Sequence, residues 1–146
     1  MRAALGCALL LAGCAMGRIA GGGDPAIRGG IVVDRGGIAT SWHPDQCHSG
    51  DRAYFAGFDF VSGSDGSRLR AALNPVGPPA AVWTAAETPQ RSVVLRQSDC
   101  SVLDIAVAPT AWRVNDVREF AGHVTLRCTA TDGTRFEGRI DVDHCH

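Results

Sequence analysis

The sequence lacks lysine altogether: its 14 basic residues are all arginine, set against 15 acidic residues in a chain of 146. The net charge at pH 7 is −1, which argues against a nucleic-acid-binding protein and against one that binds membranes through its overall charge. With 18 glycines and many alanines and valines, the missing lysine is typical of a genome composition bias. Hydrophobic residues make up 45% and charged residues 20%, which indicates one globular domain rather than a disordered chain.

Two kinds of catalytic or metal-binding motif are also missing. No C-x-x-C pair occurs, so neither a zinc ribbon nor a thioredoxin-type redox site is supported. No G-x-S-x-G elbow occurs, and the run His48-Ser49-Gly50-Asp51 is only local, whereas catalytic triads are assembled in space. The sequence therefore predicts a protein that is not an enzyme.

Long hydrophobic runs are absent too, because the apolar stretch at the N-terminus is far shorter than the about 20 residues that cross a bilayer. Arg2 precedes this stretch and small residues end it, which is the pattern of a secretory signal peptide. It closes with Leu11-Ala12-Gly13-Cys14, which resembles the lipobox of bacterial lipoproteins. The resemblance covers the export segment alone.

The lipobox resemblance implies cleavage before Cys14, with residues 1–13 as the signal peptide. In that class the cysteine thiol carries lipid and the new N-terminus is acylated; two or more acyl chains give stable anchoring. Ala15 rather than aspartate follows, which resembles the pattern sorted to the outer membrane of Gram-negative bacteria. We therefore expect an exported, lipid-anchored protein with its domain in the periplasm or at the cell surface.

After Cys14 the chain divides into two parts. Residues 14–30 are rich in glycine and lack apolar periodicity, which predicts a flexible tether. Residues 31–146 contain seven or eight short apolar or alternating segments, with turn signals roughly every 8–12 residues. This pattern predicts one all-β domain, either an antiparallel β-sandwich or a small barrel.

The cysteines left outside the export segment are an even number, which in an exported domain indicates two disulfides. They are Cys47, Cys100, Cys128 and Cys145. One of the three pairings is excluded by a predicted hairpin. Residues 123–130 and 135–142 both alternate polar and apolar, and a three-residue loop ending in Gly133 joins them, so Cys128 faces Phe136.

In that hairpin Cys145 lies on the order of 30 Å from Cys128 at the strand rise, far beyond the about 7 Å that a disulfide spans. Two pairings remain open. We favour Cys100–Cys128 with Cys47–Cys145, because residues 102–108 are expected to form a strand beside residues 118–130.

Four histidines flank two of these cysteines. His43 and His48 lie around Cys47, and His144 and His146 around Cys145. If these two cysteines are bonded, four imidazoles gather at one place and provide ligands for zinc or copper. The sequence thus carries an alternative function, a periplasmic metal-binding protein, against the simpler interpretation of polar residues flanking an exposed disulfide.

The main hypothesis is an envelope lipoprotein with a non-enzymatic binding or structural β-domain, which presents a surface to an envelope protein or polymer. No cofactor is expected in this hypothesis. Most of the nine aromatic residues are needed for a core, which weakens a sugar-stacking role for Trp42, Trp83, Trp112 and Tyr54. Five arginines of the C-terminal half are balanced by acidic residues, which favours a salt-bridged surface over an anion site: Arg113, Arg118, Arg127, Arg135 and Arg139.

Overall fold

The computed structural model describes residues 25–146 and folds them mainly into antiparallel strands. The strands are β1 (Ala26–Arg35), β2 (Ile38–Trp42), β3 (Gln46–Ser49), β4 (Ala56–Val61), β5 (Arg68–Leu73), β6 (Ala80–Thr84), β7 (Ser92–Arg96), β8 (Cys100–Val114), β9 (Val117–Thr129) and β10 (Arg135–Cys145). Two short 3₁₀ helices are η1 (Gly50–Ala53) and η2 (Gln97–Asp99). The predicted signal peptide and the anchor Cys14 lie outside the described residues. No helix in the described part is long and apolar enough to cross a membrane.

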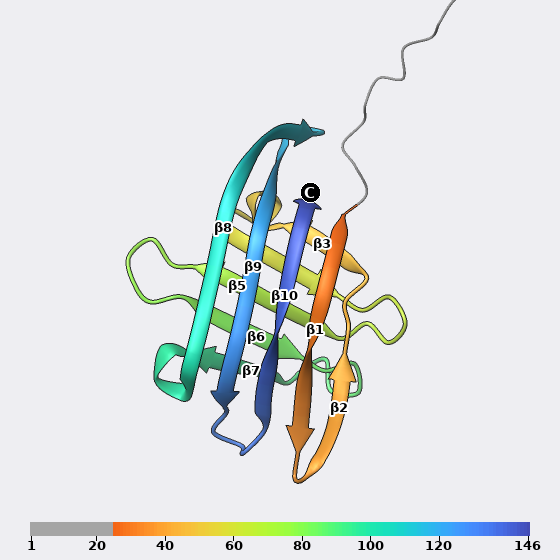
Figure 1. The fold of residues 1–146 in the computed structure, drawn as a ribbon, viewed down its shortest axis with the longest axis vertical. Helices are drawn as coiled ribbons and strands as arrows, with labels where there is room; N and C mark the ends of the chain where they lie inside the picture. Colours follow the sequence, from red (N-terminus) through yellow and green to blue (C-terminus); the bar gives the residue numbers. More distant parts are fainter. Residues whose placement is uncertain (1–24) are drawn as a thin grey trace, which may run out of the picture.

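The strands form two five-stranded sheets. The front sheet has the order β2-β1-β10-β9-β8 and the back sheet the order β3-β4-β5-β6-β7, named for the view of Figure 1. The strands of the back sheet cross those of the front sheet steeply (Figure 1), which is one of the two common ways for sheets to pack. The predicted all-β fold is confirmed. Of the two architectures left open it is the sandwich, because each sheet keeps two edge strands.

The structure has ten strands where the sequence predicts seven or eight, and the two that sequence analysis missed are β2 and β3. In β3 the two buried positions are Cys47 and Ser49, so the strand has no run of large apolar residues to reveal it. In β2 only Trp42 is buried. Both strands are held by their neighbours in the sheets rather than by a strong pattern of their own.

Strand β1 already includes residues 26–30, so the predicted start of the domain at Ile31 is wrong and these residues do not belong to the predicted tether, residues 14–30. Residues 26–30 pair with β10, from Ala26 opposite Asp143 to Gly30 opposite Arg139. Two of these positions, Gly29 and Gly30, carry no apolar side chain because the neighbouring backbone lies too close. A Cβ on Gly30 would lie 2.4 Å from the carbonyl oxygen of Trp42, and Gly29 has a φ of +84°.

The predicted hairpin is confirmed in both register and turn. Phe136 lies opposite Cys128 in the β9–β10 ladder. Gly133 adopts a φ of +85° in the connection and donates its N–H to the Ala130 carbonyl oxygen at 2.9 Å. The odd-length loop therefore keeps the apolar faces of both strands on the same side, as the alternation requires.

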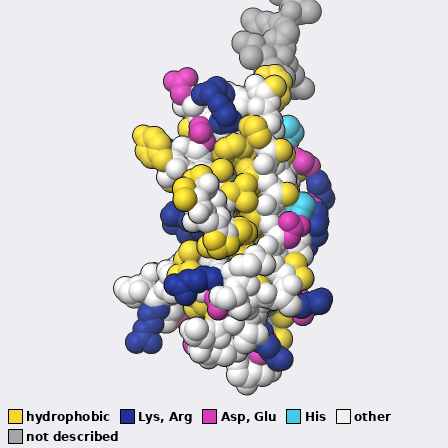
Figure 2. Space-filling model, turned by 90° about the vertical axis from the view of Figure 1, so that its left-hand side faces the viewer, with side chains coloured by type: hydrophobic (Ala, Val, Ile, Leu, Met, Phe, Trp, Pro, Cys, Tyr) yellow, Lys and Arg dark blue, Asp and Glu magenta, His cyan; other side chains and the backbone are white. Residues whose placement is uncertain are grey.

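The hydrophobic core lies between the two sheets. Phe58 and Phe60 of β4 and Phe136 of β10 are 0–1% exposed, and Leu69 and Leu126 fill the space around them. Seen from the β8 side, hydrophobic side chains gather between the layers, with charges of both signs around them (Figure 2).

The outer face of the front sheet is covered by ion pairs, as the balanced charges predict. Those between neighbouring strands are Arg28–Asp143, Asp34–Arg135 and Arg127–Glu137, and Arg139–Asp141 lies within β10. His123 Nε2 also lies 2.8 Å from Asp104 Oδ2. The Arg139 guanidinium lowers the pKa of Asp141, and hydrogen bonding to Asp141 raises the pKa of Arg139. The arginines of these pairs each have their own carboxylate, so this part of the surface is locally neutral.

Both favoured disulfides are present. Cys47 in β3 of the back sheet bonds Cys145 at the end of β10 in the front sheet, with a Cα–Cα distance of 5.3 Å. Cys100 and Cys128 join β8 to β9 within the front sheet, with a Cα–Cα distance of 3.9 Å. One bridge thus ties the two layers together and the other braces a single ladder. Two disulfides in an all-β domain fit an exported protein.

The two disulfides are expected to contribute unequally to stability. The Cys47–Cys145 bridge has a sequence separation of 98 and the Cys100–Cys128 bridge one of 28. The loop-entropy relation then gives about 4.7 and about 3.6 kcal/mol, respectively. Urea unfolding of the Cys47→Ser/Cys145→Ser and Cys100→Ser/Cys128→Ser proteins measures the difference. A larger loss in the Cys100–Cys128 pair would contradict the expectation.

Candidate functional site

A cleft of about 420 Å³ opens between the sheets at the end marked by the β1–β2 turn. Its lining comes from both layers: Val33, Arg35, Ile38, Thr40 and Trp42 from β1 and β2, and Asp65, Ser67, Trp83, Ala85 and Glu87 from the back-sheet side. The β2 residues that line it are every second one, because side chains alternate along a strand. One face of β2 therefore forms a wall of the cleft.

Two tryptophans meet edge to face beside the cleft. The rings of Trp42 and Trp83 are 4.9 Å apart at 89°, and Trp83 also packs on Phe136. Trp42 donates its indole N–H to Ser67 Oγ at 2.6 Å. The indole Nε1 of Trp83 is buried and has no hydrogen-bond partner among residues 25–146. A buried donor without an acceptor is costly, so a group that brings an oxygen to it would be stabilised.

Ile38 makes the cleft apolar at its outer part. It is 74% exposed although its side chain lies on the inner side of the β1–β2 hairpin. Val33 and Trp42 of the same hairpin are 7% and 6% exposed, because they lie further from the β1–β2 turn than Ile38 does. An exposed isoleucine next to an open cleft is a place where an apolar partner would remove surface from water.

Charged groups at the cleft are already paired. Arg35 forms an ion pair with Glu87. Ser67 donates to Asp65 through both its hydroxyl, at 2.6 Å, and its backbone N–H, at 2.9 Å, and these bonds lower the pKa of Asp65. The pKa of Glu87 is lowered by its own backbone N–H and then by Arg35. Both carboxylates are therefore held as anions, and neither is poised as a general base near pH 7.

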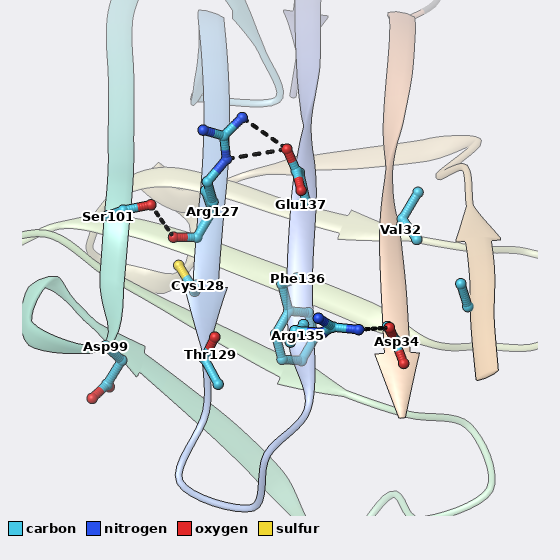
Figure 3. Close-up of a pocket in the computed structure, with 11 residues that line it drawn as sticks. Val32, Asp34, Asp99, Ser101, Arg127, Cys128, Thr129, Arg135, Phe136 and Glu137 are labelled. Carbon is cyan, nitrogen blue, oxygen red and sulfur yellow. Dashed lines mark hydrogen bonds and ion pairs between the residues drawn. The ribbon is translucent and has the colours of Figure 1, made fainter. Parts of the chain in front are cut away.

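A second hollow, of about 490 Å³, lies on the outer face of the front sheet across β8, β9, β10 and β1. Figure 3 shows that Arg127 reaches Glu137 and that Arg135 reaches Asp34, while Phe136 points away into the core. A ligand here would have to separate these pairs. The cleft between the sheets is the better candidate because its apolar wall and its free indole N–H are not engaged.

The four histidines do not form the metal centre that sequence analysis proposed as an alternative. No group of three or more His, Cys, Asp or Glu side chains in the described chain is arranged to hold a metal ion. His48 and His146 border one hollow together with Cys47, whereas His43 and His144 contact the Gly29 carbonyl oxygen and Glu119. The prediction placed the disulfide correctly, but the four imidazoles around it do not converge.

Each histidine has its own surroundings. His43 lies between β2 and β3, with Nδ1 3.1 Å from the Gly29 carbonyl oxygen. His48 lies opposite Asp59 in the back sheet. His144 has Nδ1 3.0 Å from Glu119 Oε1, and His146 has Nδ1 3.0 Å from the His144 carbonyl oxygen. Of the four, His48 and His146 border a common hollow.

Several residues of interest had no signal in the sequence. Ile38 stands alone after a glycine turn, and Ser67 belongs to a polar run that indicates only a loop. Trp42 and Trp83 are core residues, 6% and 4% exposed, whereas Trp112 and Tyr54 lie exposed on other elements. The four aromatics therefore do not form a single stacking platform.

Comparison of the chain with protein families, curated proteins and solved structures finds no match in any of the three.

Asp65 predicts a pH dependence of stability. Its folded-state pKa is lower than that of the unfolded chain, near 3.9, so its contribution is present above about pH 4 and is lost as the pH falls through the folded value. Asp65→Asn should therefore lower the melting temperature at pH 7, and the gap to the unaltered protein should shrink below about pH 4. Thermal unfolding followed by circular dichroism measures this difference in melting temperature at each pH. A gap that stays constant down to about pH 2 would contradict this origin.

Proposed function

We propose that this protein is a lipid-anchored lipoprotein of the cell envelope, held at the outer membrane through Cys14, whose β-domain is a non-enzymatic binding module. Its ligand is an extended segment of an envelope protein, which adds to the edge of β2 and places an apolar side chain in the cleft. The observation that carries this proposal is the coincidence of an unpaired strand edge with an open apolar cleft on the same strand.

Strand addition suits the chemistry of this edge. β2 is the outermost strand of the front sheet, so one row of its backbone N–H and C=O groups has no partner strand among the described residues. Main-chain hydrogen bonds would supply affinity, and the pocket beside alternate residues would supply specificity. Ile38 and the indole N–H of Trp83 offer a contact to an apolar side chain and to an oxygen, respectively.

The position of the cleft supports a partner away from the anchoring membrane. Ala26 and the C-terminus lie at one end of the sandwich and the β1–β2 turn at the other (Figure 1). The chain between Cys14 and Ala26 spans at most about 40 Å when fully extended. With the anchor at Cys14, the cleft is presented on the far end of the domain.

The cleft predicts binding that is sensitive to Ile38. The probe is a lysine-flanked heptapeptide that alternates threonine and valine around a central leucine, labelled for fluorescence anisotropy. Ile38→Asp should weaken its binding by about tenfold or more, because a buried apolar contact is replaced by a charge. Val76→Asp is the matched control, since Val76 is 94% exposed and lies in the loop at the opposite end of β5.

A peptide with proline in place of the two threonines beside the leucine cannot complete a ladder and should not bind. Equal binding of both peptides, or an equal loss in both variants, would contradict strand addition at β2.

Membrane attachment is predicted to depend on Cys14. Cys14→Ser removes the thiol that would carry the lipid, so the protein should move from the membrane to the soluble fraction after cell lysis. Immunoblots of fractionated cells measure the change, with Cys7→Ser as the control. Membrane retention of the Cys14→Ser protein would contradict the anchor while leaving the proposed cleft untouched.

A further inference from the structure

A smaller hollow, of about 230 Å³, opens on the outer face of the back sheet beside η1. Its polar and aromatic lining consists of His48, Ser49, Arg52, Phe55, Asp59 and Arg68. Phe58 and Phe60 point into the core, so Asp59 between them points outward into this lining. The hollow is therefore a surface feature of the back sheet, separate from the cleft between the layers.

One carboxylate in this hollow serves two guanidinium groups. Arg68 Nε lies 2.9 Å from Asp59 Oδ1, and Arg70 donates to Asp59 Oδ2, also at 2.9 Å. Asp59 is 7% exposed, whereas the side chains of Arg68 and Arg70 are 45% and 43% exposed. The buried carboxylate orients both arginines and neutralises only one of them, so a positive charge remains facing solvent.

The aromatic ring of Phe55 fixes the second arginine further. The guanidinium carbon of Arg70 lies 5.2 Å from the centre of the Phe55 ring, a cation–π contact. A Cβ on Gly57 would lie 2.9 Å from this ring, so the ring rests directly on the strand. Arg70 Nε and Asp59 Oδ1 are both buried without a hydrogen-bond partner among residues 25–146, so the hydrogen bonding of this cluster is incomplete on both the donor and the acceptor side.

Arg52 and His48 complete the wall. Arg52 lines the hollow and forms no ion pair with any described residue. His48 lies opposite Asp59 in the β3–β4 ladder. The nearby carboxylates Asp45 and Asp51 do not line the hollow, because they accept the backbone N–H groups of Gly63, at 2.7 Å, and Arg118, at 2.8 Å.

We propose that this hollow binds a phosphate group, held by Arg52 and Arg68 with His48 beside them. Guanidinium groups bind phosphate oxygens through paired, charge-assisted hydrogen bonds. The Asp59 carboxylate behind Arg68 holds its guanidinium group in place. The contrast with the front sheet supports a specific site: there Arg127 and Arg139 each have their own carboxylate, whereas here Arg68 and Arg70 share Asp59 and Arg52 has none among the described residues.

The location favours the phosphate of an anionic lipid headgroup as the source. Pro25, where the described chain begins, borders the neighbouring hollow together with His48 and Arg52. The described chain therefore begins beside Arg52 and His48. The choice of lipid rests on the proposed anchor at Cys14, whereas the phosphate site itself does not. Basic side chains close to an anionic membrane surface add to the affinity of an acylated protein.

The experiment uses the oxidised full-length Cys14→Ser protein, so that an acyl chain cannot mask binding through the hollow. Inorganic phosphate is titrated at constant ionic strength and followed by the NMR signals of the arginine Nε–H groups. A saturable shift is expected at Arg52 and Arg68. Arg52→Gln should weaken phosphate binding by about tenfold. Arg91→Gln, the same change at an exposed arginine before β7, should leave it unchanged.

Co-sedimentation with phosphatidylglycerol–phosphatidylcholine vesicles, compared with pure phosphatidylcholine vesicles, distinguishes the two sources. Phosphate binding together with retention on the anionic vesicles supports the headgroup. Phosphate binding without retention supports the site and overturns the lipid as its source. Absence of a saturable shift, or equal weakening by Arg52→Gln and Arg91→Gln, overturns the site. His48→Gln provides a second variant if Arg52→Gln does not fold.

Discussion

The Cys47–Cys145 disulfide is the constraint on which the rest of the structure depends. It joins the back sheet to the last strand of the front sheet, beside the point where β1 begins. Two sheets that cross steeply share a limited contact area. A disulfide between them at one end therefore limits how far the sheets can separate at the other end. The closed end holds the N-terminal part of the domain and the cationic hollow. The open end holds the tryptophan-lined cleft.

The two outer faces differ in how their charges are used. On the front sheet, arginine and carboxylate side chains neutralise each other in pairs, which provides solubility and modest stability. On the back sheet, Asp59 is surrounded by more arginine than it can balance. The closed end is therefore suited to anions and the open end to an extended apolar segment. A protein held by its N-terminus would place the first towards the membrane and the second away from it.

The sequence predicted the parts of the structure that rest on local alternation. The register of residues 123–142 follows from two alternating runs and an odd loop, and the same register excluded one disulfide pairing. It did not predict β1 before Ile31, because Gly29 and Gly30 form strand through close backbone approach rather than through side chains.

The predicted four-histidine cluster does not form. Spacing along the chain placed four histidines near one bridge, but His43 and His144 are engaged by the Gly29 carbonyl oxygen and Glu119, and no three of the described His, Cys, Asp or Glu side chains come together to hold a metal ion. The cleft was not predictable, since Ile38, Ser67 and Trp83 come from three separated segments and meet only through the packing of the two sheets. The cationic hollow likewise depends on η1 and on cross-strand neighbours that no linear motif records.

The central claim is that an extended segment binds along β2 with a side chain in the cleft. Intermolecular nuclear Overhauser effects between the leucine methyls of the heptapeptide and the uniformly ¹⁵N,¹³C-labelled protein test it most directly. The account predicts contacts from those methyls to Ile38 and to the indole of Trp83, with the peptide backbone along β2. Contacts confined to β8, the opposite edge of the same sheet, would contradict it.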